Sequence, residues 1–240
     1  MTKPHERPPT LIDLLRRARR SNETATNITS AEIEAAYYAQ RGPYRKRPYF
    51  VVHAETDRTK ETSNRGEEWL ARRLYAQQEL VLPDGDQLQL LDYQFPLKAA
   101  RSDVGVGKVD LVGVTRDGTF GLVELKIGGS TENPVLALLE VLAYGAIVRD
   151  NLPTISSEAL AKGKCSGRLT DIRHFIIAQP DFWDRWRRAP RARRWSRFCC
   201  LHQELSNRFR IDCLALDVKA GQASRPVTYR LRSVDMPARK

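Results

Sequence analysis

The chain has 240 residues and a formal net charge of +11. A chain of this length can form one α/β core with appendages. Its net positive charge favours a polyanionic partner such as nucleic acid, or an anionic surface. There is no run of about 18 apolar residues and no apolar leader, and the four cysteines lack Cys-x-x-Cys spacing. We therefore expect a cytoplasmic protein with no membrane partner.

The first 60 residues differ from the rest in composition. We expect a helical, basic N-terminal extension here, followed by an α/β domain over residues 61–240. Proline-rich Met1–Pro9 is expected to be disordered, and two amphipathic stretches then predict short helices. These helices are Leu11–Arg20 and Ser30–Gln40, the second capped by Ser30.

A basic loop follows the second predicted helix. The stretch Arg41–Arg47 combines four cations with the aromatic Tyr44. Cations contact phosphates and aromatic rings stack on bases, so this loop is a candidate nucleic-acid arm. A solvated surface segment explains it equally well.

The core is expected to begin with a helix near Asn64. If Asn64 caps that helix, Glu67 is a capping-box carboxylate. Alternatively, Glu67 lies on the same helical face as Leu70 and Leu74, which is the buried face, and looks into a site.

Alternating and β-branched patterns predict a central mixed sheet flanked by helices, which is an α/β fold. A buried helix, capped by Asn133, is expected at Val135–Val148, and a polar loop at Asn151–Leu169. The predicted strands are Gln87–Phe95, two strands around Val109 and Phe120, Arg173–Ala178, Arg210–Val218 and Val227–Val234.

The two strands around Val109 and Phe120 carry the most informative polar residues. Thr115–Thr119 predicts a hairpin loop with Asp-Gly as its turn signal. Side chains alternate along a strand, so Glu124 and Lys126 share one face, and Asp110 on the paired strand can reach it. Such hard oxygen ligands suit Mg²⁺ or Mn²⁺, and the lysine suits an attacking water or a phosphate oxygen. The alternative is a cross-strand ion pair on a solvated face.

The predicted buried helix adds two polar residues to this set. Glu140 is its only interior charge, and Tyr144 follows one turn later on the same side. Because a buried polar group needs partners, we expect both to face the polar pocket. A structural hydrogen bond between Glu140 and a buried arginine is the alternative.

The order and spacing of these residues resemble the PD-(D/E)XK nuclease superfamily, near its RecB-like exonuclease branch. The family pattern is Gly-x-x-Asp, then Glu-x-Lys after a hairpin, then Gln-x-x-x-Tyr, with an acidic residue on an earlier helix. This chain has Gly107 and Asp110, then Glu124 and Lys126, then Glu140 and Tyr144, with Glu67 upstream. It departs from the pattern at Val109, where proline is usual, and at Glu140, where the RecB-like branch has glutamine. The match covers about residues 64 to 150.

The resemblance implies a restriction-endonuclease-like core and a metal-dependent nuclease, with DNA as the expected substrate. It implies that Mg²⁺ or Mn²⁺ is held by Asp110, Glu124, the Leu125 carbonyl and Glu67, directly or through water. Lys126 would orient or activate water, and Glu140 and Tyr144 would orient Lys126 or the phosphate. The alternatives are a non-catalytic nucleic-acid-binding module and an RNA-directed or defence effector nuclease. Many members act as dimers, which leaves a homodimer open.

One further segment, Asp181–Arg197, mixes tryptophans with arginines. Its arginines are candidate phosphate contacts, and its tryptophans either stack on unpaired bases or pack in the core. The candidate phosphate-binding arginines are Arg185, Arg187, Arg188, Arg191, Arg193, Arg194 and Arg197.

Overall fold

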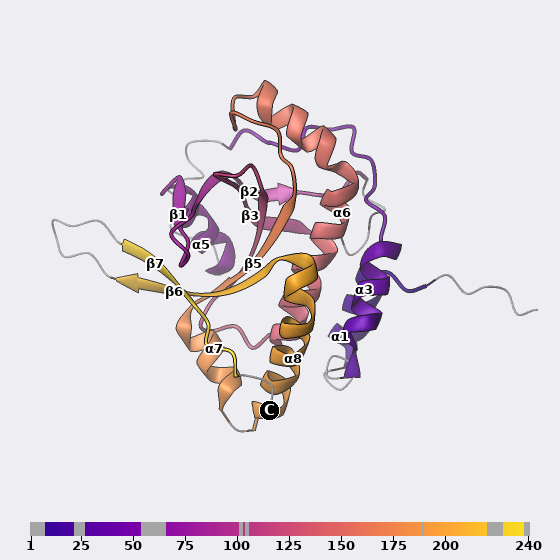
Figure 1. Cartoon of the computed structure of the whole chain (residues 1–240), viewed down its shortest axis with the longest axis vertical. Helices are drawn as coiled ribbons and strands as arrows, with labels where there is room; N and C mark the ends of the chain where they lie inside the picture. The colour runs from indigo at the N-terminus through magenta and orange to yellow at the C-terminus, as the bar shows by residue number, and fades with distance from the viewer. Residues whose placement is uncertain are drawn as a thin grey trace, which may run out of the picture.

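The computed structural model describes residues 8–21, 27–53, 66–100, 103, 106–188, 190–219 and 228–237, and these form an α/β fold around one mixed sheet (Figure 1). The sheet order follows the chain, from β1 to β7. The strands are β1 (Glu79–Val81), β2 (Gln87–Pro96), β3 (Lys108–Thr115), β4 (Phe120–Lys126), β5 (Ile172–Ala178), β6 (Ile211–Lys219) and β7 (Thr228–Ser233). The helices are α1 (Leu11–Arg20), α3 (Ser30–Ala39), α5 (Gly66–Tyr75), α6 (Pro134–Ala161), α7 (Pro180–Arg187) and α8 (Ala192–Phe209).

The first four strands form an antiparallel meander, while β4, β5 and β6 are parallel to one another. Helix α6 makes the crossover from β4 to β5, and α7 and α8 make the crossover from β5 to β6. The sheet curls so strongly that β1 comes close to β7. The predicted β3–β4 hairpin is confirmed. Its turn needs Gly118, whose φ is +83°, and Asp117 accepts a hydrogen bond from the Thr119 amide at 3.1 Å.

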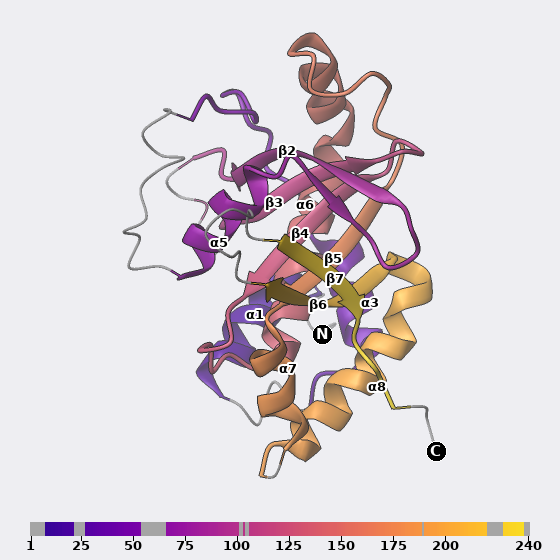
Figure 2. The same ribbon diagram turned by 90° about the vertical axis from the view of Figure 1, so that its left-hand side faces the viewer.

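Helices cover both faces of the sheet, so the core divides into two clusters. Helix α5 packs on one face, while α6 with α1 and α3 lies on the other (Figure 2). Strand β4 confirms the predicted alternation, because Leu122 belongs to the α6 cluster while Val123 and Leu125 belong to the α5 cluster. Side chains at even-numbered positions of β4 therefore point towards α6.

Helix α6 is longer than its sequence pattern predicts. The expected loop at 151–169 is wrong over residues 151–161, where the helix continues through Pro153. The continuation is stable because Ile155 and Ala159 are buried, and because Glu158 accepts the backbone amides of Tyr49 and Phe50 at 2.8 and 3.0 Å. Among the described residues, no helix is both long enough and apolar enough to cross a membrane.

The N-terminal helices pack into the same core as α6. Leu11, Leu14 and Leu15 of α1 are buried in that cluster, and a capping box of Thr10 and Asp13 starts the helix. The predicted cap of α3 is wrong by one residue: Thr29 precedes the helix and exchanges hydrogen bonds with Glu32, which leaves Ser30 as its first residue. The expected domain boundary at residue 60, and residues 1–7 of the stretch 1–9 that is expected to be disordered, lie outside the described residues.

Candidate functional site

Strand β4 places Glu124 and Lys126 on one face, as the alternation predicts, and buries both. Glu124 is 6% exposed and Lys126 is 3% exposed. Their carboxylate and ammonium groups are 2.8 Å apart. The alternative of an ion pair on a solvated face is therefore wrong. A buried charge pair is costly to form and is stable only with further partners.

Carboxylates surround the ammonium group of Lys126 on several sides. Besides Glu124, Nζ lies 2.7 Å from Glu132 Oε2, 3.4 Å from Glu140 Oε2 and 3.9 Å from Glu67 Oε1. These residues come from four separate parts of the chain: β4, the loop after β4, α6 and the first turn of α5. Lys126 is therefore the centre of a group that we call the acidic cluster, consisting of Glu67, Asp110, Glu124, Glu132 and Glu140.

Asp110 is held at the edge of this cluster by two hydrogen bonds. Its Oδ2 accepts the Leu125 amide at 2.9 Å, and its Oδ1 accepts Nε2 of Gln94 at 3.1 Å. Gln94 has a φ of +51°, an unusual conformation for a residue other than glycine. Such a local departure from strand geometry directs Gln94 at Asp110, and backbone strain of this kind is common at functional sites.

Burial and mutual repulsion raise the pKa values of the carboxyl groups. Desolvation raises the pKa of Asp110 to about 7, against the Leu125 amide hydrogen bond and Lys126, which lower it. Desolvation raises the pKa of Glu124 well above its ordinary value, and nearby Glu140 and Asp110 raise it further. The pKa of Glu67 is raised for the same reasons. Burial alone would lower the pKa of Lys126, but four carboxylates hold it well above its ordinary value, so the amine stays protonated.

Helix α6 brings Glu140 and Tyr144 to the same region. Glu140 contacts two cations: Lys126 through Oε2, and Arg19 of α1 through Oε1. The alternative prediction was a buried arginine as the partner of Glu140. Arg19 is such a partner, but its side chain is half-exposed, and Lys126 also pairs with Glu140. Desolvation raises the pKa of Tyr144 well above its ordinary value, and the nearby carboxylates add to this. A Cβ added at Gly107 would lie 2.5 Å from the Tyr144 hydroxyl oxygen, so only glycine at this position leaves room for the tyrosine ring.

Sequence reasoning missed three members of this site. Glu132 lies in the loop after β4, where no periodic pattern marks a residue as buried. The sequence pattern predicts only a strand for the segment with Gln94 and only a short helix for the segment with Arg19. One signal in the sequence pointed to such residues: the predicted site residues contain more carboxylates than cations. Buried carboxylates need partners, so further cations are expected nearby.

The loop after β4 is fastened to α7 by backbone contacts. Arg185 donates to the carbonyl oxygens of Gly128, Gly129 and Ser130 at 3.0, 3.2 and 3.3 Å. Gln179, just before α7, accepts the Gly128 amide at 2.7 Å. Arg185, predicted as a phosphate contact, thus holds the loop that carries Glu132.

The other arginines of residues 185–197 divide into engaged and open side chains. Arg187 donates to the Asp235 carbonyl at 3.1 Å, and Arg197 donates to the Ile28 carbonyl. Arg191 lies over the Trp186 ring at 5.2 Å. Arg188 and Arg193 are exposed and Arg194 is half-buried, so these three remain accessible for phosphate contacts. Trp183, Trp186 and Trp195 are buried, so the core-packing alternative for the tryptophans is confirmed.

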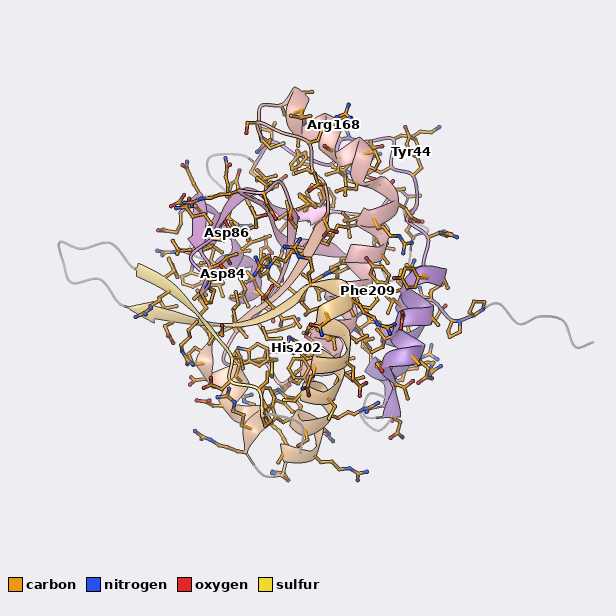
Figure 3. The ribbon with its side chains drawn as sticks, in the orientation of Figure 1. Tyr44, Asp84, Asp86, Arg168, His202 and Phe209 are labelled. Atoms are coloured by element: carbon orange, nitrogen blue, oxygen red, sulfur yellow. The ribbon has the colours of Figure 1, made fainter. Side chains whose placement is uncertain are left out.

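The basic loop at residues 41–47 lies away from the acidic cluster. Tyr44 is 70% exposed and lies at the end of the molecule where Arg168 is found (Figure 3). The loop is anchored to α6, because the Gly42 amide donates to Asp150 at 3.0 Å. Arg45 donates to the Pro48 carbonyl at 3.1 Å. Arg41, Lys46 and Arg47 are exposed, which is compatible with either reading of the loop.

A surface pocket of about 430 Å³ opens onto the cluster. It is lined by Glu67, Glu68, Gln94 and Asp110, together with the backbone of the loop at Gly129 and Ser130. This pocket gives solvent and solutes access to Asp110 and Glu67, whereas Lys126 lies behind them and is buried.

The charge of the cluster is unbalanced. Five carboxylates face two cations, Lys126 and Arg19, so three negative charges would stay uncompensated if all were ionised. Within the described ranges, no three histidine, cysteine, aspartate or glutamate side chains form a ready-made metal cluster. The oxygen donors and surplus negative charge of the carboxylates fit a hard divalent cation.

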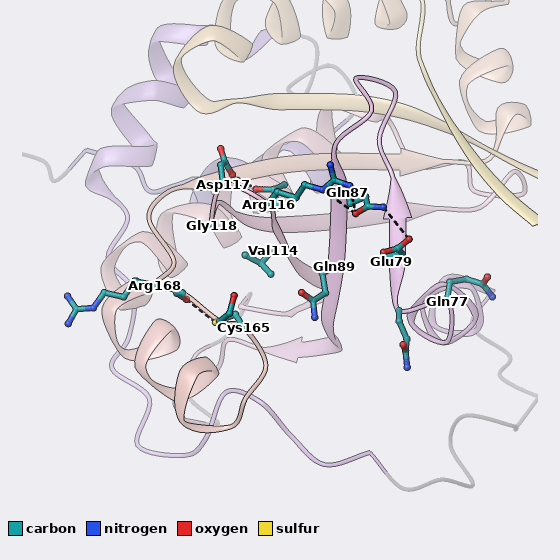
Figure 4. A pocket seen from close by; sticks show the side chains of 14 residues that line it. Gln77, Glu79, Gln87, Gln89, Val114, Arg116, Asp117, Gly118, Cys165 and Arg168 are labelled. Atoms are coloured by element: carbon teal, nitrogen blue, oxygen red, sulfur yellow. Dashed lines mark hydrogen bonds between the residues drawn. The ribbon is translucent and has the colours of Figure 1, made fainter.

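A second hollow, of about 620 Å³, lies at the turn end of the β3–β4 hairpin (Figure 4). Its lining is polar and includes Gln87 and Arg116, which are hydrogen-bonded at 2.7 Å. None of the acidic-cluster residues lines it. The chain thus has separate hollows at the two ends of this hairpin.

Comparisons with protein-family models, with curated proteins and with solved structures find no match to this chain.

Proposed function

We propose that the chain is a metal-dependent nuclease that hydrolyses phosphodiester bonds, with DNA as its substrate. The single observation that supports this most is the charge imbalance around Lys126: buried carboxylates with raised pKa values outnumber the cations that face them. Stability alone does not account for such a costly arrangement, because an apolar cluster of similar volume is often at least as stable. Perturbed carboxyl groups beside an open pocket are typical of a functional site.

The residues that would hold Mg²⁺ or Mn²⁺ are Asp110, Glu124 and Glu67, with the Leu125 carbonyl. These are hard oxygen donors, and Asp110 and Glu67 line the open pocket. When bound, the divalent ion would supply charge that stabilises the pentacoordinate transition state at phosphorus and lowers the pKa of water.

The chain's own residues carry the remaining roles. Lys126 stays protonated, so in this proposal it orients the attacking water or offsets charge developing on a phosphate oxygen. Glu132 and Glu140 hold the ammonium group from two sides and restrict its position. Gln94 fixes the orientation of the Asp110 carboxylate. Tyr144 keeps its phenol protonated and is able to donate a hydrogen bond.

The finer fold proposal is that β2 to β5 with α5 and α6 form a restriction-endonuclease-like core. The hairpin that carries Asp110, Glu124 and Lys126, followed by a crossover helix with Glu140 and Tyr144, supports it. The net charge of +11 and the open arginines of residues 185–197 support a nucleic-acid substrate.

The proposal is tested by incubating the purified chain with labelled single-stranded and duplex DNA and RNA in Mg²⁺, Mn²⁺ or EDTA. We expect cleavage of DNA with either metal and none in EDTA. Binding of DNA without cleavage under any condition would favour the non-catalytic module. Cleavage of RNA alone would favour the RNA-directed alternative.

A further inference from the structure

Helix α1 brings a cation to the acidic cluster from far away in the sequence. Arg19 lies in the last turn of α1 and forms an ion pair with Glu140 of α6. The helix is held in place by buried Leu11, Leu14 and Leu15. The position of Arg19 beside Glu140 is therefore fixed by the packing of α1 on α6.

Arg19 differs from Lys126 in its access to solvent. Lys126 is buried and surrounded by carboxylates, so it cannot attract a polyanion from solution. The side chain of Arg19 is 48% exposed, whereas that of Glu140 is 6% exposed. Among the described residues, the cations that pair with the acidic cluster are Lys126 and Arg19, and Arg19 is the exposed one.

A nucleic acid that approaches this cluster meets a surplus of negative charge, which repels its phosphates. A guanidinium group at the rim offsets that repulsion and can bind a phosphate through two parallel hydrogen bonds. Because half of the Arg19 side chain stays in solvent, its guanidinium group is accessible to a phosphate while it pairs with Glu140.

We propose that Arg19 is a substrate-binding residue that binds a backbone phosphate beside the acidic cluster, while Glu140 holds its side chain at the exposed edge of that cluster. This inference rests on the proposed function and deepens it, because it assigns the N-terminal helix to the substrate site. Arg20, the next residue, is also exposed and extends the basic rim.

The test measures the affinity of labelled single-stranded and duplex DNA by fluorescence anisotropy in EDTA, at several salt concentrations. Arg19→Ala is compared with Arg17→Ala, which removes the same charge from the same helix. In the wild type, Arg17 pairs with Glu32 and not with Glu140. We expect Arg19→Ala to weaken binding about tenfold and to reduce the slope of log affinity against log salt by about 1. Arg17→Ala should change the affinity less than twofold.

Arg19→Lys tests whether the geometry of the guanidinium group matters beyond its charge. Lysine keeps the positive charge but lacks the planar group that donates two parallel hydrogen bonds to a phosphate. We expect an intermediate affinity, with a salt slope like that of the wild type. Thermal unfolding of all variants checks that α1 remains docked, and Arg19→Gln replaces Arg19→Ala if the alanine variant does not fold.

Equal affinities of Arg19→Ala and Arg17→Ala would overturn the inference, as would a wild-type chain that does not bind DNA. A fall in kcat for Arg19→Ala at unchanged affinity would also overturn it, since Arg19 would then act only through Glu140. If the wild type binds DNA in an Arg19-dependent way yet cuts nothing with Mg²⁺ or Mn²⁺, the inference holds and the proposed function fails.

Discussion

Glu132 Oε2 lies 2.7 Å from Lys126 Nζ, so a loop residue and a strand residue form one of the tightest contacts of the site. The contact links the loop after β4 to the centre of the acidic cluster. Because Arg185 holds the same loop from the α7 side, the geometry around Lys126 depends on elements that lie some 60 residues apart in the chain.

The first prediction concerns the stability that Lys126 provides. Lys126→Met should lower the free energy of unfolding by about 3 to 5 kcal/mol at pH 8, because it leaves buried carboxylates without their central cation. The loss should shrink at pH 5, where carboxyl groups with raised pKa values take up protons. Urea unfolding at the two pH values measures this. An equal loss at both would show that the lysine acts only through its packing.

Asp110→Asn should have the opposite effect on stability. The pKa of Asp110 is about 7 in the folded chain and near 3.8 when unfolded, so the folded state holds this proton more tightly. The destabilisation is absent below pH 3.8, grows as pH rises towards 7 and is complete above it. The asparagine variant lacks this titration, so it should unfold some degrees higher than the wild type at pH 8 and at about the same temperature near pH 4. A variant less stable than the wild type at pH 8 would contradict the raised pKa.

Gly107 and Tyr144 offer a paired test of how the tyrosine is positioned. Gly107→Ala places a methyl group 2.5 Å from the Tyr144 hydroxyl oxygen, so the ring must shift, and we expect a loss of activity of about tenfold or more. Tyr144→Phe removes that oxygen and relieves the closest contact. The double variant should therefore be no less active than Tyr144→Phe alone, as measured by cleavage of labelled DNA. Fully additive losses would show that the two residues act independently.

Arg185 and Arg188 should separate positioning from substrate binding. Arg185 holds three carbonyl groups of the loop after β4, whereas Arg188 is exposed. Arg185→Ala should lower kcat with little change in the salt dependence of DNA binding. Arg188→Ala should weaken binding and flatten its salt dependence, with kcat retained at saturating substrate. If the two variants exchange these effects, the assignment of the loop contact is wrong.

The sequence predicts most of the local architecture of the site, because strand alternation and the hairpin turn fix which β4 side chains share a face. Glu124 and Lys126 follow from that alternation alone. Glu132 and Arg19 do not, since their contacts depend on how a loop and a distant helix pack in three dimensions. The polar stretch that begins at Asn151 predicts a loop. In the structure, buried Ile155 and the contacts of Glu158 keep α6 helical through Pro153 and outweigh the hydrogen bond that proline loses.

The most direct test of the central claim is metal-dependent cleavage of labelled DNA by the wild type and by Glu124→Gln, with Glu79→Gln as the control. Glu79 is an exposed carboxylate on β1, outside the acidic cluster, so its variant should cut DNA like the wild type. Glu124→Gln keeps the shape of the side chain but loses a metal-binding charge, so it should fold normally and lose at least about a hundredfold in cleavage. Full cleavage by Glu124→Gln, or cleavage by the wild type that persists in EDTA, would contradict a metal-dependent site around Lys126.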